Sequence, residues 1–178
     1  MFIILNGYPG VGKLTIGRIL ADKLNGRLLD IHSVYNVAFA LTEFRSADFY
    51  YAINTVEDLT DDLINRLSKD VPLVFTTVLT EQAMRGADAD MARFVRRADG
   101  RGPLRMVHLS CALDENKRRI QSQARDGMRK LRDPDMVQRN HAGGAVLSGG
   151  DLPHLLTLDI TDLSAQAAAD RIARWAQR

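Results

Sequence analysis

The sequence predicts an α/β fold, with a single doubly wound and mostly parallel five-stranded sheet and helices on both of its faces. Short apolar segments alternate with helical ones along the whole chain, which is the order of a parallel sheet with crossover helices. The apolar segments contain few interspersed polar residues, as expected of strands covered on both faces. A glycine-rich turn joins the first apolar segment to the first helix, an arrangement typical of anion-binding α/β proteins.

The expected elements follow from these patterns in chain order. Leucine-rich and β-branched runs predict strands at 2–6, 27–31, 72–79, 104–110 and 155–160. Helical spacing of apolar residues predicts helices at 14–25, 33–42, 47–69, 81–99, 115–125 and 165–177. Asp114 and Ser164 are expected to cap the last two of these helices. The glycine-containing segment 127–153 is either a mobile lid or a surface loop.

Length and composition exclude several classes of protein. The 178 residues suit one domain spanning 1–178, and no apolar run approaches the roughly 18 residues of a membrane span. The N-terminal FIIL is shorter than the apolar region of a signal peptide and lacks a basic leader. Since a single cysteine, Cys111, cannot form an internal disulfide, we expect a cytoplasmic protein.

The distribution of charge indicates a small anionic ligand. The formal net charge of +2 is too low to predict nucleic-acid binding. Basic residues are concentrated between Lys117 and Arg132, where Asp126 is the only acid, and such a cluster in a near-neutral chain favours a compact anion. A second cluster, expected to form the solvated face of a helix, consists of the acids Glu57, Asp58, Asp61 and Asp62.

The glycine-rich turn near the N-terminus has the pattern of a phosphate-binding loop. Gly7, Gly10 and Gly12 precede Lys13 in the spacing G-x-x-G-x-G-K, between an expected strand and an expected helix. The glycines permit a tight turn and a close approach of backbone N–H groups to an anion, and the helix directs its positive end at the same point. Lys13 supplies a charge for the β- and γ-phosphates. The alternative is a glycine-rich turn with an exposed lysine.

Two departures from the strict Walker A and Walker B signatures concern the metal. Leu14 follows the lysine where the strict signature has Ser or Thr, and Thr15 is rotated about 100° further round the helix. The third strand ends in Thr76 and Thr77 rather than in an aspartate. Metal binding is therefore expected to depend on Asp30 and on water, and a motor-type ATPase is disfavoured.

In these residues the sequence resembles a known family. GYPGVGKLT is similar to the loop of adenylate kinases, in which the lysine is followed by a residue without a hydroxyl and then by Thr. LLDIH, VHLSCALDENKRRI, MRKLRDPD and LTLDITDLSAQAA are similar, in order and spacing, to segments of P-loop small-molecule and nucleotide kinases. That group includes adenylate, shikimate and gluconate kinases and chloramphenicol phosphotransferases. The resemblance implies their P-loop NTPase fold with ATP and Mg²⁺, the metal being held largely through water and nucleotide phosphates.

The resemblance also implies residues that bind the nucleotide and the metal. Arg119 would lie over the base or near the phosphates. Arg125 and Arg129 would swing in with a lid at about 118–142 and act with Lys13 in catalysis, unless they belong to a solvated basic surface. Thr15 and Asp30 are the residues expected beside the metal. The ATP phosphates would be held by Gly7, Gly10, Val11, Gly12, Lys13, Leu14 and Thr15.

The phosphoryl acceptor is expected to bind across residues 31–62. Asp30 ends the second strand, at the edge where α/β sheets place ligands. In the resembling kinases an aspartate here holds or deprotonates the acceptor hydroxyl, and the alternatives are orienting the water shell of magnesium or capping the next helix. His32 and Asn36 lie one helical turn apart and suit polar acceptor binding, whereas Arg45 suits an acceptor anion. The alternative for His32 is a polar residue satisfied by its own surroundings, and the alternative for Arg45 is an ordinary surface arginine.

These features predict an enzyme that moves the γ-phosphoryl group of ATP to a small hydroxylated metabolite or a nucleoside monophosphate. The main alternative is a P-loop protein that binds nucleotide with weak or no kinase activity, as a regulatory ATPase or a degenerate kinase. A guanine-reading switch is disfavoured because ENKRR lacks the aspartate of N-K-x-D. The low net charge disfavours a kinase acting on RNA ends. The sequence leaves open the acceptor, the choice of ATP over GTP and the oligomeric state.

Overall fold

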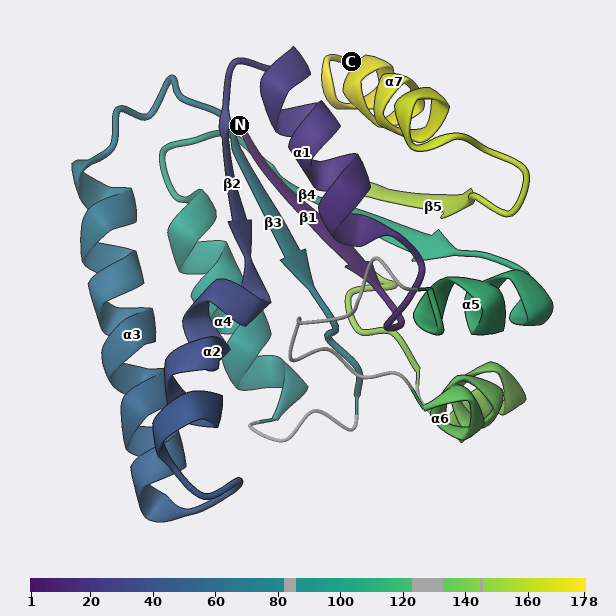
Figure 1. The fold of residues 1–178 in the computed structure, drawn as a ribbon. Coiled ribbons are helices and arrows are strands. Elements are labelled where there is room, and N and C mark those ends of the chain that lie inside the picture. Colours follow the sequence, from purple (N-terminus) through teal and green to yellow (C-terminus); the bar gives the residue numbers. More distant parts are fainter. Residues whose placement is uncertain (82–85, 123–132, 145) are drawn as a thin grey trace.

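Five parallel strands form one sheet in the order β2-β3-β1-β4-β5 (Figure 1). The computed structural model describes residues 1–81, 86–122, 133–144 and 146–178. The strands are β1 (Phe2–Gly7), β2 (Arg27–Asp30), β3 (Leu73–Thr77), β4 (Leu104–Ser110) and β5 (Leu155–Asp159). Each coincides with a run predicted from its apolar composition, and helices cover both faces of the sheet. The predicted α/β fold class is therefore confirmed.

The described helices connect these strands. They are α1 (Lys13–Lys23), α2 (Ile31–Leu41), α3 (Ala47–Arg66), α4 (Ala87–Ala98), α5 (Leu113–Ile120), α6 (Pro134–Arg139), the short π-helical segment η2 (Asn140–Gly144) and α7 (Ala165–Ala176). Among them, none combines the length and the apolar character that crossing a bilayer requires.

The ends of the helices depend on capping. Ser164 caps α7 as predicted, accepting a hydrogen bond from the N–H three residues on at 3.1 Å. Helix α5 begins earlier than predicted, with Ala112 at its N-cap, so Asp114 lies in the first turn instead of capping it. Helix α6 lies inside the segment expected to be a lid or loop. The segment is helical there because Asp133 caps it and a proline occupies its first position. Of the predicted lid, residues 123–132 lie outside the described residues.

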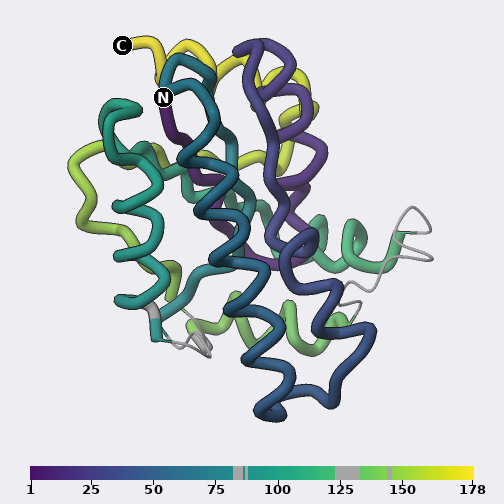
Figure 2. Tube along the Cα trace, turned by 90° about the vertical axis from the view of Figure 1, so that its left-hand side faces the viewer, coloured from purple at the N-terminus to yellow at the C-terminus, as the bar shows by residue number. Residues whose placement is uncertain are grey.

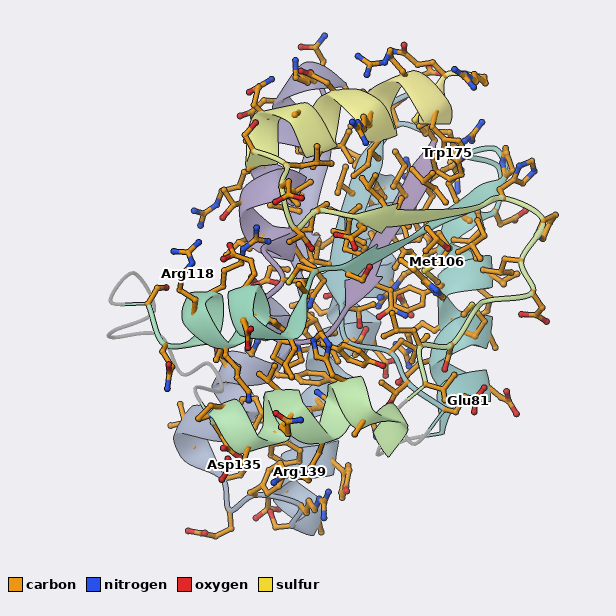
Figure 3. All side chains as sticks on the ribbon, turned by 90° about the vertical axis from the view of Figure 1, so that its right-hand side faces the viewer. Glu81, Met106, Arg118, Asp135, Arg139 and Trp175 are labelled. Carbon is orange, nitrogen blue, oxygen red and sulfur yellow. The ribbon has the colours of Figure 1, made fainter. Side chains whose placement is uncertain are left out.

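Strand β1 shows how alternation assigns side chains to the two faces of the sheet. Ile3 and Leu5 belong to the apolar cluster that includes α1 and α7, whereas Phe2 and Ile4 belong to the cluster that includes α3 and α4. All four side chains are fully buried. Trp175 of α7 packs, partly buried, against the first cluster (Figure 3). The continuous apolar composition of β1 follows from burial on both faces.

Helices α3 and α4 run side by side on one face of the sheet (Figure 2). The C-terminal end of α3 is held by Arg101, which precedes β4 and is buried. Its guanidinium donates to the carbonyl oxygens of Ile64 at 2.6 Å, Leu67 at 2.8 Å and Ser68 at 2.9 Å. These bonds satisfy carbonyl groups that a helix end leaves unpaired. The position of α3, which lines the cleft described below, is thereby tied to the sheet.

The carboxyl ends of β1, β2 and β3 lie at one edge of the sheet. Asp30 pairs in register with Thr76, and Asn6 with Thr77. The buried Asn6 side chain holds the chain that follows β3: Nδ2 donates to Leu79 O at 2.9 Å, and Oδ1 accepts from Leu79 N at 2.8 Å. Because the strands are parallel, the segments that follow them all begin at this edge.

Candidate active site

A cleft of about 680 Å³ follows the carboxyl edge of the sheet. Its walls come from the loop between β1 and α1, from the end of β2 and the start of α2, from α3 and α4, and from α5 with the segment after β5. These elements are far apart in the chain and meet because parallel strands end together. One cleft therefore contains the predicted phosphate loop, Asp30 and His32.

The loop between β1 and α1 requires glycine at two positions. Gly10 and Gly12 have φ angles of 95° and 104°, in a region that residues with a side chain rarely adopt. Val11 between them is buried, and its N–H donates to Tyr8 O at 3.4 Å. Gly10 also lies against α5, because a Cβ there would be 2.6 Å from Asn116 Nδ2. The loop thus approaches α5 more closely than a larger residue permits.

Helix α1 begins directly at this loop, with its N-terminal end at the cleft. Gly12 is its N-cap residue and supplies no side-chain cap, and the first turn carries no acid. Such a helix end presents backbone N–H groups and the positive end of the helix dipole to an anion. Lys13 crosses the loop, and its Nζ donates to Gly7 O at 2.6 Å and to Tyr8 O at 3.0 Å. The arrangement is suited to binding phosphate.

Asp30 ends β2 and occupies the N-cap position of α2, but its side chain does not cap that helix. Instead, the hydroxyl of Thr76 on the neighbouring strand donates a hydrogen bond to Asp30 Oδ1. Thr76 is fully buried, so the carboxylate is oriented from inside the sheet. The sequence predicts that Thr76 lies at the end of the third strand but does not reveal its contact with Asp30, because that contact depends on the register of two strands.

The predicted acceptor residues divide into two groups. His32 lines the cleft with Tyr35 and Phe39, which follow it on one face of α2. Asn36 lies one turn after His32 but is exposed and does not line the cleft. Arg45 is also exposed and away from the cleft, with a φ angle of 65° and its guanidinium 5.1 Å from the centre of an aromatic ring. The structure therefore brings together Asp30 and His32 but neither of the other two.

Arg119 joins the phosphate loop to the segment after β5. Its guanidinium donates to Val11 O and to Ile160 O, both at 3.1 Å, and its Nε donates to Glu115 Oε1 at 2.6 Å. Hydrogen bonds from Arg118 and Arg119 lower the pKa of Glu115 from 4.5 to about 2. Figure 3 shows Arg118 at the C-terminal end of α5. Arg119 is thus held in the wall of the cleft beside the phosphate loop.

An ion network lines the cleft where α3 and α4 meet. Arg93 and Arg97 of α4 pair with Glu57 and Asp61 of α3. Glu57 is only 4% exposed, so the prediction that the acids of 57–62 form a solvated face is wrong for this residue. The reason is matched spacing, since acids four apart on one helix meet arginines four apart on the helix beside it. The spacing was readable in the sequence, but the pairing required knowing that α3 and α4 are neighbours.

We compared the sequence with models of protein families, and the match agrees with the fold and the phosphate loop described above. The family model described as AAA domain matches residues 3–140. The chain belongs to this family. A comparison with curated protein sequences finds no match.

Solved structures resemble this AAA-domain protein over nearly its whole length. A shikimate kinase from Bacteroides thetaiotaomicron has 16% identity and a TM-score of 0.62, with 100% of this chain and 99% of that chain covered. A gluconokinase from Sinorhizobium meliloti has 14% identity and a TM-score of 0.58, with coverage of 98% and 94%. The tunicamycin resistance protein of Deinococcus radiodurans has 20% identity and a TM-score of 0.62, with coverage of 98% and 94%. These similarities show the P-loop kinase fold, and the predicted family resemblance is confirmed.

The remaining predicted residues concern the lid and the metal. Arg125 and Arg129 lie outside the described residues. Leu14 is half-buried and Thr15 is exposed, and both line the cleft. In the part of the chain that the structure describes, no group of three or more His, Cys, Asp or Glu side chains is arranged to hold a metal ion. A metal held by these residues would therefore take most of its ligands from phosphate and water.

Proposed function

We propose that this chain is an ATP- and Mg²⁺-dependent phosphotransferase that moves the γ-phosphoryl group of ATP to a small hydroxylated metabolite or a nucleoside monophosphate. The observation that carries the proposal is that the glycine loop with Lys13 and the carboxylate of Asp30 line one cleft. Phosphoryl transfer requires mainly that donor and acceptor are held side by side with charges around them. The fold shared with a shikimate kinase and a gluconokinase supports the same class of reaction. A reducing, ATP-containing cytoplasm is the compartment that the proposal implies.

The phosphates of ATP fit the turn between β1 and α1. The cradle would consist of Gly7, Gly10, Val11, Gly12, Lys13, Leu14 and Thr15. Lys13 would turn from the two carbonyl oxygens that it contacts to the β- and γ-phosphates, because a charge-assisted bond to phosphate is stronger than one to a neutral carbonyl. Arg119 would lie beside the nucleotide, in the wall that it forms between the loop and Ile160.

Mg²⁺ fits this cleft with few protein ligands. Thr15 and Asp30 both line the cleft and offer a hydroxyl and a carboxylate oxygen. Magnesium keeps several waters and takes other ligands from phosphates, so Leu14 beside Lys13 does not exclude it. When bound, the ion would neutralise charge on the β- and γ-phosphates.

We assign Asp30 to the acceptor hydroxyl. Thr76 holds the carboxylate in place, and the carboxylate would accept the hydroxyl proton as the acceptor oxygen bonds to the γ-phosphorus. The bond between that phosphorus and the bridging oxygen breaks, and ADP leaves with the electron pair. His32 lines the same cleft and would contact the acceptor. Arg125 and Arg129, from the segment outside the described residues, would surround the transferred group.

Lys13→Met tests the proposal. Loss of the ammonium should raise the Kd for ATP at least roughly tenfold in calorimetry and reduce acceptor-dependent ADP release to background. Lys23→Met is the matched control, since it makes the same change at the other end of α1, where Lys23 pairs with Asp170 at 2.7 Å. It should keep wild-type affinity and turnover. The proposal fails if Lys13→Met leaves ATP affinity unchanged and the wild-type protein releases ADP only at background over a broad acceptor panel.

A protein that binds nucleotide with weak or no kinase activity is the second candidate. Two observations favour it: Leu14 stands where a hydroxyl-bearing residue is usual, and β3 ends in Thr76 and Thr77 where many P-loop enzymes have an acid. Both reduce the number of oxygen ligands that the protein itself offers to the metal. ATP binding without ADP release over nucleoside monophosphates, sugars, sugar acids and amino alcohols would favour this function over transfer.

A further inference from the structure

We infer that the acceptor of this phosphotransferase is uncharged or cationic, such as a polyol, an amino alcohol or an amino sugar, and that carboxylates and phosphate monoesters are disfavoured. The inference rests on the proposed function and names the substrate class of the same cleft. It is carried by the ion network of α3 and α4. In this network the arginines that line the cleft are already paired with carboxylates, and one of these carboxylates, Glu57, lines the cleft itself.

Arg97 lies in the cleft wall with its charge already paired. Its Nη2 donates to Glu57 Oε2, and its Nε donates to Asp61 Oδ1 at 2.6 Å. The central carbon of the guanidinium lies 5.3 Å from the ring centre of Phe75 and 6.0 Å from that of Phe94. Arg97 is only 4% exposed. A side chain held by two carboxylates and two rings cannot turn to an acceptor anion without losing these contacts.

Arg93, one turn earlier on α4, is paired in the same way. Its Nη1 donates to Asp61 Oδ2 at 2.9 Å and to Asp58 Oδ1 at 3.3 Å. Asp61 therefore bridges the two arginines through its two oxygens. An anionic acceptor would have to displace one of these carboxylates and leave its charge without a partner in a partly buried site. This cost disfavours anionic acceptors.

Glu57 is the carboxylate of the network that could bind an uncharged or cationic acceptor directly, because it lines the cleft. It is only 4% exposed. Its Oε2 accepts a hydrogen bond from Arg97. An ionised carboxylate in the cleft wall can only accept hydrogen bonds, so it favours a ligand that brings a donor, and hydroxyl and ammonium groups are donors whereas carboxylates are not.

The network also ties α3 to α4, and a purely structural role predicts a different response to Glu57→Gln. If the network only holds the helices, this substitution changes stability and alters the KM of every acceptor to a similar extent. If Glu57 binds the acceptor, the substitution raises the KM for an amino acceptor, leaves the KM for ATP unchanged and weakens the discrimination against carboxylates. The two roles are therefore separated by kinetics with several acceptors.

The test measures ADP release with compounds that differ in one group. Glucose, glucosamine and glucuronate form one set, glycerol, serinol and glycerate form another, and AMP and CMP represent phosphate esters. In the set that the enzyme accepts, kcat/KM for the uncharged or amino member should exceed that for the carboxylate at least roughly tenfold. Glu57→Gln should raise the KM of the amino member by a similar factor. Asp62→Asn, which neutralises an exposed carboxylate of α3 that does not line the cleft, should leave the acceptor preference and both KM values unchanged.

Each outcome decides a different point. A preference for glucuronate, glycerate, AMP or CMP overturns the inference and leaves the phosphotransferase in place. Background ADP release with every compound removes the proposed function, and the inference with it. If Glu57→Gln does not fold, the double variant Glu57→Gln/Arg97→Met removes both charges together and avoids an unpaired buried arginine. Undiminished discrimination against the carboxylate in either variant also overturns the inference.

Discussion

Gly10 lies where the phosphate loop packs on α5, and Gly10→Ala measures how closely these two elements fit. The new Cβ would lie 2.6 Å from Asn116 Nδ2 and 3.2 Å from Ile120 Cβ. Asn116 is fully buried and cannot move aside cheaply, because its Nδ2 donates to Pro9 O at 3.0 Å and its Oδ1 lies 3.2 Å from a ring nitrogen of His141. The substitution therefore strains the loop, α5 or both.

The expected loss of stability has two parts. An alanine at a φ angle of 95° costs about 1–2 kcal/mol in the backbone. Forcing a methyl group into a packed contact costs a further 1–3 kcal/mol or so. The free energy of unfolding should thus fall by about 2–5 kcal/mol, which for a chain of this length lowers the unfolding midpoint by roughly 5–20 °C.

Gly12→Ala is the matched control for this measurement. Its φ angle of 104° carries the same backbone cost, but its nearest contact would be Ile16 Cδ1 at 4.0 Å. Thermal unfolding without nucleotide should therefore show a fall of only about 2–8 °C for Gly12→Ala. The Gly10→Ala penalty should also be smaller in an Asn116→Ala background, because the two sites are in contact. Equal falls for the two glycine variants would refute the packing argument.

Two further predictions concern the acceptor carboxylate and the effect of pH. Asp30→Asn keeps an Oδ1 that can accept the hydrogen bond from Thr76, so the unfolding midpoint should stay close to that of the wild type. The kcat for acceptor phosphorylation should fall roughly a hundredfold or more, because the amide cannot accept the hydroxyl proton. A near-normal kcat would remove the proposed role of Asp30 as a base. Hydrogen bonds from Arg118 and Arg119 lower the pKa of Glu115 from 4.5 to about 2, so the folded state holds this carboxylate ionised more strongly than the unfolded chain does. Its stabilising contribution is complete above pH 4.5 and is lost as the pH falls towards about 2. Glu115→Gln should lose less stability than the wild type over that interval in thermal unfolding at several pH values, and identical pH profiles would contradict the assignment.

The strands and the phosphate loop were predictable because their signals are continuous along the chain. A strand covered on both faces is apolar at nearly every position, as in β1 and β3, and this pattern needs no knowledge of its neighbours. The loop was readable for a similar reason, since Gly10, Gly12 and Lys13 lie within four residues and their requirements are local. Helix caps were harder to predict from the sequence. Asp133 caps α6 in a segment that the sequence indicated to be a lid or loop.

The part of the cleft around Asp30 was predicted less well because its contacts join residues that are distant in the chain. Asp30 and His32 were predicted from their place at the end of a strand, and both line the cleft. Asn36 and Arg45 follow them closely in the sequence but do not line the cleft. Thr76 reaches Asp30 across 46 residues through strand register. No local pattern encodes that register.

Short-range patterns were thus sufficient for the sheet, for the crossover helices and for a loop suited to phosphate, because each depends on backbone conformation and on burial that repeats every two or about four residues. Packing alone decided which of the charges on α3 and α4 line the cleft. Glu57 and Arg97, 40 residues apart, become a buried pair only because α3 and α4 lie against each other on the sheet. The same residues on separate helices would be ordinary solvated charges, since an ion pair exists only where two side chains are brought within a few ångströms.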